Sequence, residues 1–205
     1  FFDGLSHGDE LRHRSLEGTY YRRVALSLLP ERCQTILDLG TGSGLLLPAL
    51  LERADRVIAV DSSTTMLDLA RQTVGGDAHR CDFRLGDLEH LPVADGEVDA
   101  VVACMVLHHV SVPATALSEA WRALREDGEV AVIDLARHQD ESLREQFADL
   151  WLGFQPVEMR RWLRESGFSL DPVDTGAPSA TPDDATQDIQ LITFKGKKPC
   201  SRRSP

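Results

Sequence analysis

The sequence lacks a long hydrophobic run, a clustered cysteine pair and an excess of positive charge. Its longest apolar stretches, such as Ala100–Val110, are far shorter than the roughly 18–20 residues of a membrane span, so we expect no membrane association. The four cysteines form no C-x-x-C pair, which favours reduced thiols and a cytoplasmic location. Thirty-three acidic and 22 basic residues give a net charge of −11, and this charge argues against direct nucleic-acid binding.

The length and composition indicate one globular domain. With 205 residues, of which 42% are hydrophobic, the chain is long enough to bury a core of its own. We predict a single domain over residues 1–195, with a helical lid (1–30), a ligand-binding core (35–135) and C-terminal helices and strands (136–194). Residues 195–205 are expected to form a flexible tail.

Short apolar runs alternate with amphipathic ones, which is typical of βα units in a parallel sheet. The sequence therefore predicts an α/β fold, doubly wound and Rossmann-like, with helices on both faces. The predicted strands are Thr35–Leu39, Arg56–Val60, Asp82–Leu85, Val98–Ala103, Glu129–Ile133 and Ile189–Phe194. The predicted helices are Leu11–Leu29, Ser62–Leu69, Ala114–Leu124, Ser142–Leu152 and Val157–Glu165.

A glycine-rich loop follows the first predicted strand. In ILDLGTGSGLL, glycines stand at positions 40, 42 and 44, where they permit a tight turn and a close approach of the backbone to a ligand. The dinucleotide fingerprint G-x-G-x-x-G requires a glycine where this chain has Leu45. Pyrophosphate binding is therefore the less favoured use of the loop.

Three carboxylates follow or precede strand ends near this loop. Asp61 ends the second strand, where a carboxylate accepts ribose hydroxyls. Asp38 precedes the loop and suits a cationic amino group, and Asp87, with Leu88, suits an adenine ring. Together they predict a pocket for a nucleoside that carries a cationic amino-acid tail and no phosphate, which describes S-adenosyl-L-methionine.

Four motifs in order carry a resemblance to a known family: LDLGTGSG, VIAVDSS, GDLEHLPVADGEVDAVVA and LREDGEVAVIDL. Over Ile36–Leu135 the chain resembles the class I S-adenosylmethionine-dependent methyltransferases of the methyltransferase type 11 kind. The resemblance implies a seven-stranded sheet, mostly parallel, whose last strand is reversed; Ile189–Phe194 is the candidate for it. It also implies that the cofactor, with S-adenosyl-L-homocysteine as its product, is bound by Asp38, Gly40, Thr41, Gly42, Gly44, Asp61, Ser62, Met66, Gly86, Asp87, Leu88 and Cys104.

The flanks, FFDGLSHGDELR, LEGTYYRRVALSLLPE and RHQDESLREQFADLWLGF, are similar to methyltransferase domains fused behind bacterial regulators of the arsenic-repressor type. Gly8 stands near the place where that subgroup commonly carries a tryptophan, so one substrate contact differs. This likeness implies a winged-helix DNA-binding domain upstream of Phe1 or a family member that lacks one. It identifies no methyl acceptor.

Imidazole and phenol groups are the candidates for a general base. His108 and His109 follow the fourth strand and are the first choice, with Tyr21 and His138 as further candidates. Asp134, His138 and Glu141 are candidate metal ligands, but no second tight cluster accompanies them, so we predict no metal site.

The predicted function is methyl transfer to an unidentified small-molecule acceptor. Two alternatives stay open: a non-catalytic sensor of S-adenosylmethionine or another metabolite attached to a transcriptional regulator, and an NAD(P)-dependent oxidoreductase. The oligomeric state is open, with a homodimer as one option.

Overall fold

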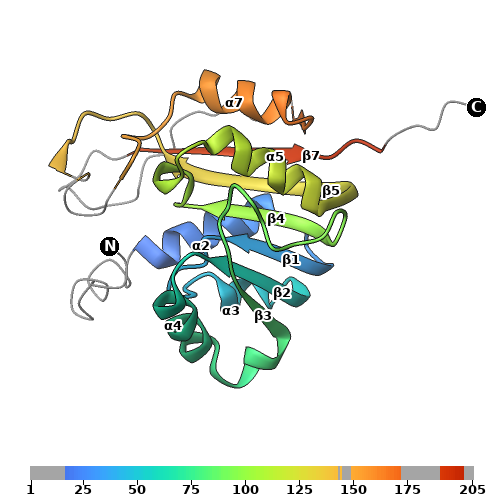
Figure 1. Cartoon of the computed structure of the whole chain (residues 1–205). Helices are drawn as coiled ribbons and strands as arrows, with labels where there is room; N and C mark the ends of the chain where they lie inside the picture. The colour runs from blue at the N-terminus through green and yellow to red at the C-terminus, as the bar shows by residue number, and fades with distance from the viewer. Residues whose placement is uncertain (1–16, 143, 145–148, 172–189, 201–205) are drawn as a thin grey trace, which may run out of the picture.

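The computed structural model describes residues 17–142, 144, 149–171 and 190–200. Its centre is one sheet of seven strands in the order β3-β2-β1-β4-β5-β7-β6 (Figure 1), so the predicted doubly wound α/β fold is confirmed. The strands are β1 Cys33–Leu39, β2 Ala54–Asp61, β3 Cys81–Leu85, β4 Val98–Cys104, β5 Leu124–Leu135, β6 Ser169–Leu170 and β7 Leu191–Lys197.

The strand directions also agree with the prediction. Strands β1 to β5 pair in parallel, and β7 runs antiparallel to β5, with Val132 opposite Phe194. The reversed strand begins at Leu191 and ends at Lys197, later than the predicted Ile189–Phe194, of which residue 189 lies outside the described residues. The short strand β6 pairs only with β7 and was not predicted.

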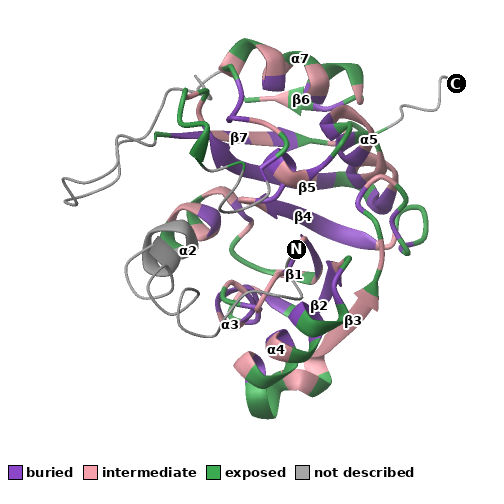
Figure 2. Cartoon of the chain, turned by 60° about the vertical axis from the view of Figure 1, so that its left-hand side comes forward, coloured by how far each residue is buried: buried purple, intermediate pink, exposed green. Residues whose placement is uncertain are grey.

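Helices cover both faces of the sheet. The sheet separates the hydrophobic core into two clusters, one on each face. On one face, α5 (Pro113–Ala123) and α7 (Pro156–Glu165) pack through residues such as Leu117 and Leu163. On the other face lie α2 (Glu17–Leu28), α3 (Leu47–Leu50) and α4 (Thr64–Val74). Figure 2 shows the central strands buried between these layers. Among the described residues, no helix combines the length and apolarity that crossing a membrane requires.

Local signals explain where the helices begin. The Ser63 hydroxyl accepts the Met66 N–H at 3.2 Å and caps α4, and Gly75 ends that helix with a φ of +53°. Pro113 and Pro156 open α5 and α7, where a missing N–H leaves no hydrogen bond unmade. The sheet continues between these helices because β1, β2 and β4 are apolar enough to be buried on both faces.

Two predicted boundaries differ from the structure. The helix predicted over Ser142–Leu152 does not include residues 149–152, because the N–H groups of Leu150 and Trp151 donate to the His108 carbonyl instead of to a helical turn. The remainder of that segment is largely outside the described residues. Of the tail predicted over residues 195–205, residues 195–197 belong instead to β7, and residues 201–205 lie outside the described residues. Residues 1–16 of the predicted lid lie outside the described residues.

Candidate functional site

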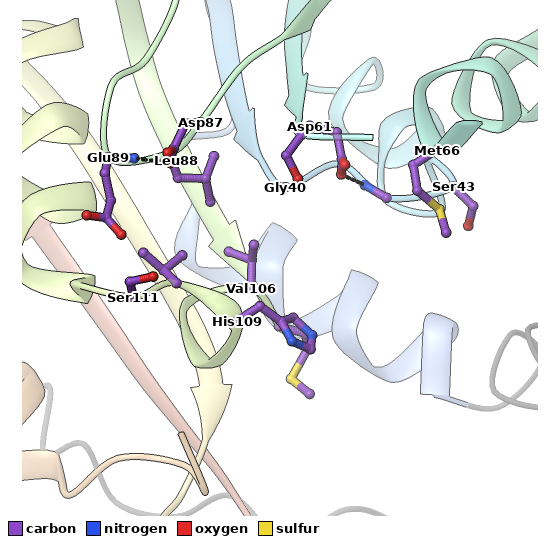
Figure 3. Close-up of a pocket in the computed structure, with 14 residues that line it drawn as sticks. Gly40, Ser43, Asp61, Met66, Asp87, Leu88, Glu89, Val106, His109 and Ser111 are labelled. Carbon is purple, nitrogen blue, oxygen red and sulfur yellow. Dashed lines mark hydrogen bonds between the residues drawn. The ribbon is translucent and has the colours of Figure 1, made fainter. Parts of the chain in front are cut away.

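A pocket of about 420 Å³ lies at the carboxyl ends of β1, β2 and β4. This is the edge at which open α/β sheets bind ligands, next to the point where the strand order reverses between β1 and β4. In Figure 3 the glycine loop and the end of β2 form one side, and the loop after β3 forms the other. The pocket is lined by Gly40, Gly42, Ser43, Asp61, Ser62, Met66, Asp87, Leu88, Glu89, Met105, Val106, His109, Val110 and Ser111.

The glycine loop is shaped by backbone conformations that suit glycine. Gly40, Gly42 and Gly44 have φ values of +64°, +53° and +80°. A Cβ at Gly40 would lie 2.1 Å from the Val106 side chain, and one at Gly44 would lie 2.8 Å from the Ala70 backbone. A Cβ at Gly42 would meet nothing within 4 Å. Two glycines thus allow close packing of the loop, and the third leaves space in the pocket.

Asp61 ties the loop to the start of α4. Its carboxylate accepts the Gly42 N–H at 2.8 Å through one oxygen and the Ser63 N–H at 2.9 Å through the other. Each carboxylate oxygen has a second lone pair, so both bonds leave acceptor capacity toward the pocket that Asp61 lines. Asp61 therefore holds the loop closed while it presents negative charge to a ligand.

Asp38 lies beneath the loop and is only 3% exposed. The Thr41 hydroxyl donates to its carboxylate at 2.7 Å. Burial raises the pKa of Asp38 to about 7, with the hydrogen bond from Thr41 opposing the shift and the charge of Asp61 adding to it. Neither Asp38 nor Thr41 is among the residues that line the pocket.

The loop after β3 presents Asp87, Leu88 and Glu89 to the pocket. Asp87 accepts the Glu89 N–H at 2.9 Å, and Glu89 accepts the Val112 N–H at 3.0 Å. Gly86 does not line the pocket but is needed for the turn, since a Cβ there would lie 2.5 Å from the Pro92 ring. The three acids predicted at strand ends therefore lie around the same site, two of them at its surface.

The two histidines differ in position. Both lie in η3 (Leu107–His109), directly after β4, but only His109 lines the pocket. His108 is 4% exposed, and its Nδ1 donates to Asp134 Oδ1 at 2.6 Å. Burial acts to lower the pKa of His108, but the carboxylates of Asp134 and Asp149 outweigh it, so the pKa lies above its usual value.

Asp149 completes this cluster and was not predicted. It is 4% exposed, and one oxygen lies 3.8 Å from His108 Nε2 and 3.6 Å from His109 Nδ1. Its position 40 residues beyond the histidines gives no sequence pattern that would have connected them. Glu141, a candidate metal ligand from the sequence, instead forms an ion pair with Arg144 at 2.9 Å.

The other predicted site residues have varied positions. His138 lies outside the pocket, and its Nδ1 accepts the Asp140 N–H at 3.2 Å. Tyr21 belongs to α2, but its side chain lies outside the described residues. Cys104, Gly44 and Gly86 support the site without lining it, and burial raises the pKa of the Cys104 thiol.

Sequence reasoning missed several lining residues, of which Met105 is the most unusual. It has a φ of +55°, a conformation that non-glycine residues seldom adopt, and its N–H donates to the Ile133 carbonyl at 2.8 Å. The sequence indication available for Met105 was its position directly after β4. The other missed residues are Ser43, Glu89, Val106, Val110 and Ser111.

Comparison with known proteins finds a family model, described as a methyltransferase domain, that matches residues 37–132. An uncharacterised 37.1 kDa protein in transposon TN4556 of Streptomyces fradiae is 36% identical over 134 residues, covering 63% of this chain and 38% of that protein. An arsenite methyltransferase of Halobacterium salinarum is 37% identical over 108 residues, covering 51% of this chain and 28% of that protein.

Among solved structures, a chain of the complex between the Haloferax volcanii Trm112 methyltransferase activator and a methyltransferase has a TM-score of 0.74. It is 24% identical, and the match covers 94% of this chain and 96% of that one. The similarity supports the fold over nearly the whole length. In contrast, the chain spans less than half the length of the two sequence relatives.

Proposed function

Because this chain belongs to the class I S-adenosylmethionine-dependent methyltransferases, we propose that it transfers a methyl group to a small-molecule acceptor. The cofactor of the family is S-adenosyl-L-methionine, and its product is S-adenosyl-L-homocysteine. The sequence relatives have different names and extend well beyond the aligned part. The acceptor and the activity of the whole protein are therefore inferred from the site.

The observation that carries the proposal is the charge of the pocket lining. The lining contains Asp61, Asp87 and Glu89 and, among the described residues, no lysine or arginine. A dinucleotide brings two phosphates, which such a surface would repel. A nucleoside with a cationic sulfonium and a cationic amino group is attracted to it. This contrast favours S-adenosylmethionine over NAD(P).

The residues present fit the cofactor in three places. Asp61 has free acceptor capacity for ribose hydroxyls, and the open space at Gly42 admits a ligand against the loop. Asp87 and Leu88 provide an acceptor and an apolar surface for the adenine. Asp38, held by Thr41, supplies negative charge below the loop for the amino group. When bound, the cofactor supplies an electrophilic methyl group on sulfur.

The protein contributes mainly by positioning. Holding two reactants in an aligned geometry contributes about 7–11 kcal/mol to a barrier. His109 lines the pocket and accepts the proton of a protonated acceptor. His108 lies behind it, hydrogen-bonded to Asp134, and acts as a positioning residue. The roles of His138 and Tyr21 as bases are secondary proposals, since His138 lies outside the pocket.

Calorimetric titration with S-adenosylhomocysteine tests the cofactor. We expect saturable heat with the wild-type protein and at least about 100-fold weaker binding to Asp61→Ala, because two hydrogen bonds to a charged group contribute about 1.5–3 kcal/mol each. Asp68→Asn is the matched control, since Asp68 is an exposed acid on α4 paired with Arg71. Absence of heat in the wild type, or binding of NAD in its place, would contradict the proposal.

A metabolite sensor is the second candidate, because a sensor and an enzyme share every cofactor contact described above. The likeness of the flanks to regulator fusions supports it, with an upstream winged-helix domain as the partner. The observation favouring an enzyme is the imidazole of His109 in the pocket. Release of S-adenosylhomocysteine in the presence of candidate acceptors separates the two: an enzyme produces it in proportion to acceptor, whereas a sensor binds the cofactor unchanged.

A further inference from the structure

We propose that His108, His109 and Asp149 form a binding site for one divalent transition-metal ion, with Zn²⁺ as the best match to the ligands. The three ligand atoms all lie within 4.8 Å of one another. Two imidazole nitrogens and one carboxylate oxygen are the donor set that suits zinc and related borderline metals, whereas Mg²⁺ and Ca²⁺ prefer oxygen ligands. The proposal concerns a cluster that sequence reasoning did not connect.

The distances favour an ion over direct pairing. A carboxylate in a charge-assisted hydrogen bond lies about 2.7–2.9 Å from the donor nitrogen. Asp149 Oδ1 instead lies 3.8 Å from His108 Nε2 and 3.6 Å from His109 Nδ1. Ligands of a tetrahedral zinc ion, each about 2.0–2.2 Å from the metal, lie roughly 3.4 Å apart. The two distances to Asp149 are thus within a few tenths of an ångström of this spacing. The two imidazole nitrogens, which lie within 4.8 Å of each other, must approach by at most about 1.4 Å to hold the ion.

The Asp149 carboxylate points to a missing ligand. Its side chain is 3% exposed, and within the described residues Oδ1 has no hydrogen-bond partner. A buried carboxylate oxygen without a partner is costly, and a cation in contact with it removes that cost.

The His108 ring is oriented by a carboxylate behind it, as is common for histidines that bind metals. Its Nδ1 donates to Asp134, so in the neutral ring the lone pair is on Nε2, which lies 3.8 Å from Asp149 Oδ1. Such a carboxylate–histidine pair behind a metal fixes the tautomer and the orientation of the ring. Asp134 is itself fixed, because it accepts the N–H groups of Leu107 and Leu135 at 2.9 and 2.8 Å.

Backbone hydrogen bonds hold the segment of Asp149 against the histidines. The His108 carbonyl accepts the N–H groups of Leu150 and Trp151 at 3.0 and 3.1 Å, and the Trp151 indole donates to the Val110 carbonyl at 2.9 Å. The three ligands thus come from two chain segments that these hydrogen bonds hold together. The site is preorganised in the way that metal binding requires.

An ion at this site would lie next to the pocket, because its ligand His109 lines the pocket. Three protein ligands leave one tetrahedral position open, and a metal lowers the pKa of a group bound there. With the ion bound, the lone pair of His109 is held by the metal, so the metal would take over the activation of the acceptor from the free imidazole. The acceptor class would then be a molecule with a hydroxyl, thiol or amine that coordinates the metal. This consequence rests on the proposed function, whereas the binding of the ion does not.

The test is metal titration of the untagged full chain after removal of bound metals with a chelator. We expect one Zn²⁺ per chain by calorimetry, and Co²⁺ as the spectroscopic probe should give the visible absorption bands of a tetrahedral ion. Asp149→Asn should weaken Zn²⁺ binding at least tenfold, and Asp134→Asn should weaken it about 10–100-fold through His108. His79→Ala is the control, since the exposed His79 ring is hydrogen-bonded to the Gly76 carbonyl at 2.9 Å and does not belong to the cluster.

Folding of each variant is checked by thermal denaturation, and His109→Ala replaces Asp149→Asn if the latter does not fold. Absence of saturable Zn²⁺ binding, or equal binding by the wild type and the cluster variants, would overturn the site. S-adenosylhomocysteine titration of the same samples separates the two proposals. Metal binding without S-adenosylhomocysteine binding refutes the proposed function alone, and the reverse result refutes the metal site alone.

Discussion

The Nδ1 of His108 donates to the carboxylate of Asp134 at 2.6 Å, and neither side chain is more than 5% exposed. The pair connects the end of β5 to the turn after β4, and it lies directly behind the histidine that lines the pocket. The two neighbouring histidines therefore have separate roles. One is held in the core by a buried carboxylate, and the other lines the pocket.

The first prediction concerns stability. His108→Ala should lower the free energy of unfolding by about 1.5–3 kcal/mol, because the fully buried Asp134 loses a hydrogen bond to a charged group. His109→Ala should cost less, since its side chain is 21% exposed. Urea denaturation of both variants measures the difference. Equal losses would show that burial of the pair is not what stabilises this turn.

The second prediction concerns activity. His109→Ala should lower methyl-transfer turnover about 100-fold or more with an acceptor that must lose a proton, because proton transfer by a positioned side chain contributes about 10²–10⁴-fold. Its affinity for S-adenosylhomocysteine should change little, since the contacts proposed for the nucleoside are those of Asp61 and Asp87. Turnover and calorimetry on the same sample provide the check. Unchanged turnover with a protonated acceptor would remove His109 from the mechanism.

The third prediction is a pH dependence that originates in Asp38. Its pKa of about 7 exceeds the ordinary value of 3.8, so the folded protein retains a proton that the unfolded chain has lost. The stability that Asp38 contributes is full below about pH 3.8 and is lost as the pH rises toward 7. S-adenosylhomocysteine affinity should instead rise about fivefold between pH 6 and pH 7, as the carboxylate becomes able to pair with the amino group. Asp38→Asn should bind weakly with no such rise; a rise of equal size in that variant would assign it to another group.

The fourth prediction separates two glycines of one loop. Gly40→Ala should destabilise the protein by more than 1–2 kcal/mol, since a positive φ costs about that much for alanine and its Cβ would overlap Val106. Gly42→Ala carries a similar backbone cost without the overlap, but its Cβ enters the pocket. We therefore expect the larger fall in melting temperature for Gly40→Ala. Relative to its fall in melting temperature, Gly42→Ala should lose more ligand affinity. The opposite ranking in melting temperature would contradict the packing explanation.

Much of the fold was predictable because its strands are buried on both faces. Runs such as Arg56–Val60 and Val98–Ala103 are mostly apolar, and the observed strands contain them. Where tertiary contacts decide, the prediction was less accurate. Strand β7 continues past residue 195 because it pairs with β5, and the Lys198 ammonium donates to the carbonyls of Trp121 and Leu124 at 2.9 and 2.6 Å. A basic segment near a chain end carries no local sign of such partners.

The site shows the same division. Asp61 and Asp87 were found because each follows a strand at a fixed distance from the glycine loop, so sequence spacing reports their spatial order. Asp149 was missed because only the packing of its segment against η3 brings it to the histidines. The distinction between His108 and His109 likewise depends on which ring faces Asp134, and adjacent residues of one type give no indication of it.

Met105 imposes an energetic cost on the free protein. Its left-handed backbone costs about 1–2 kcal/mol relative to glycine, yet its side chain forms part of the pocket wall. Replacement by glycine would remove the backbone strain but would also remove a side chain from the pocket wall. Stability of the folded protein therefore favours glycine at this position, whereas a complete pocket wall favours methionine. The Met105 backbone thus makes the turn less stable, while the Met105 side chain completes a wall of the pocket that a ligand can contact.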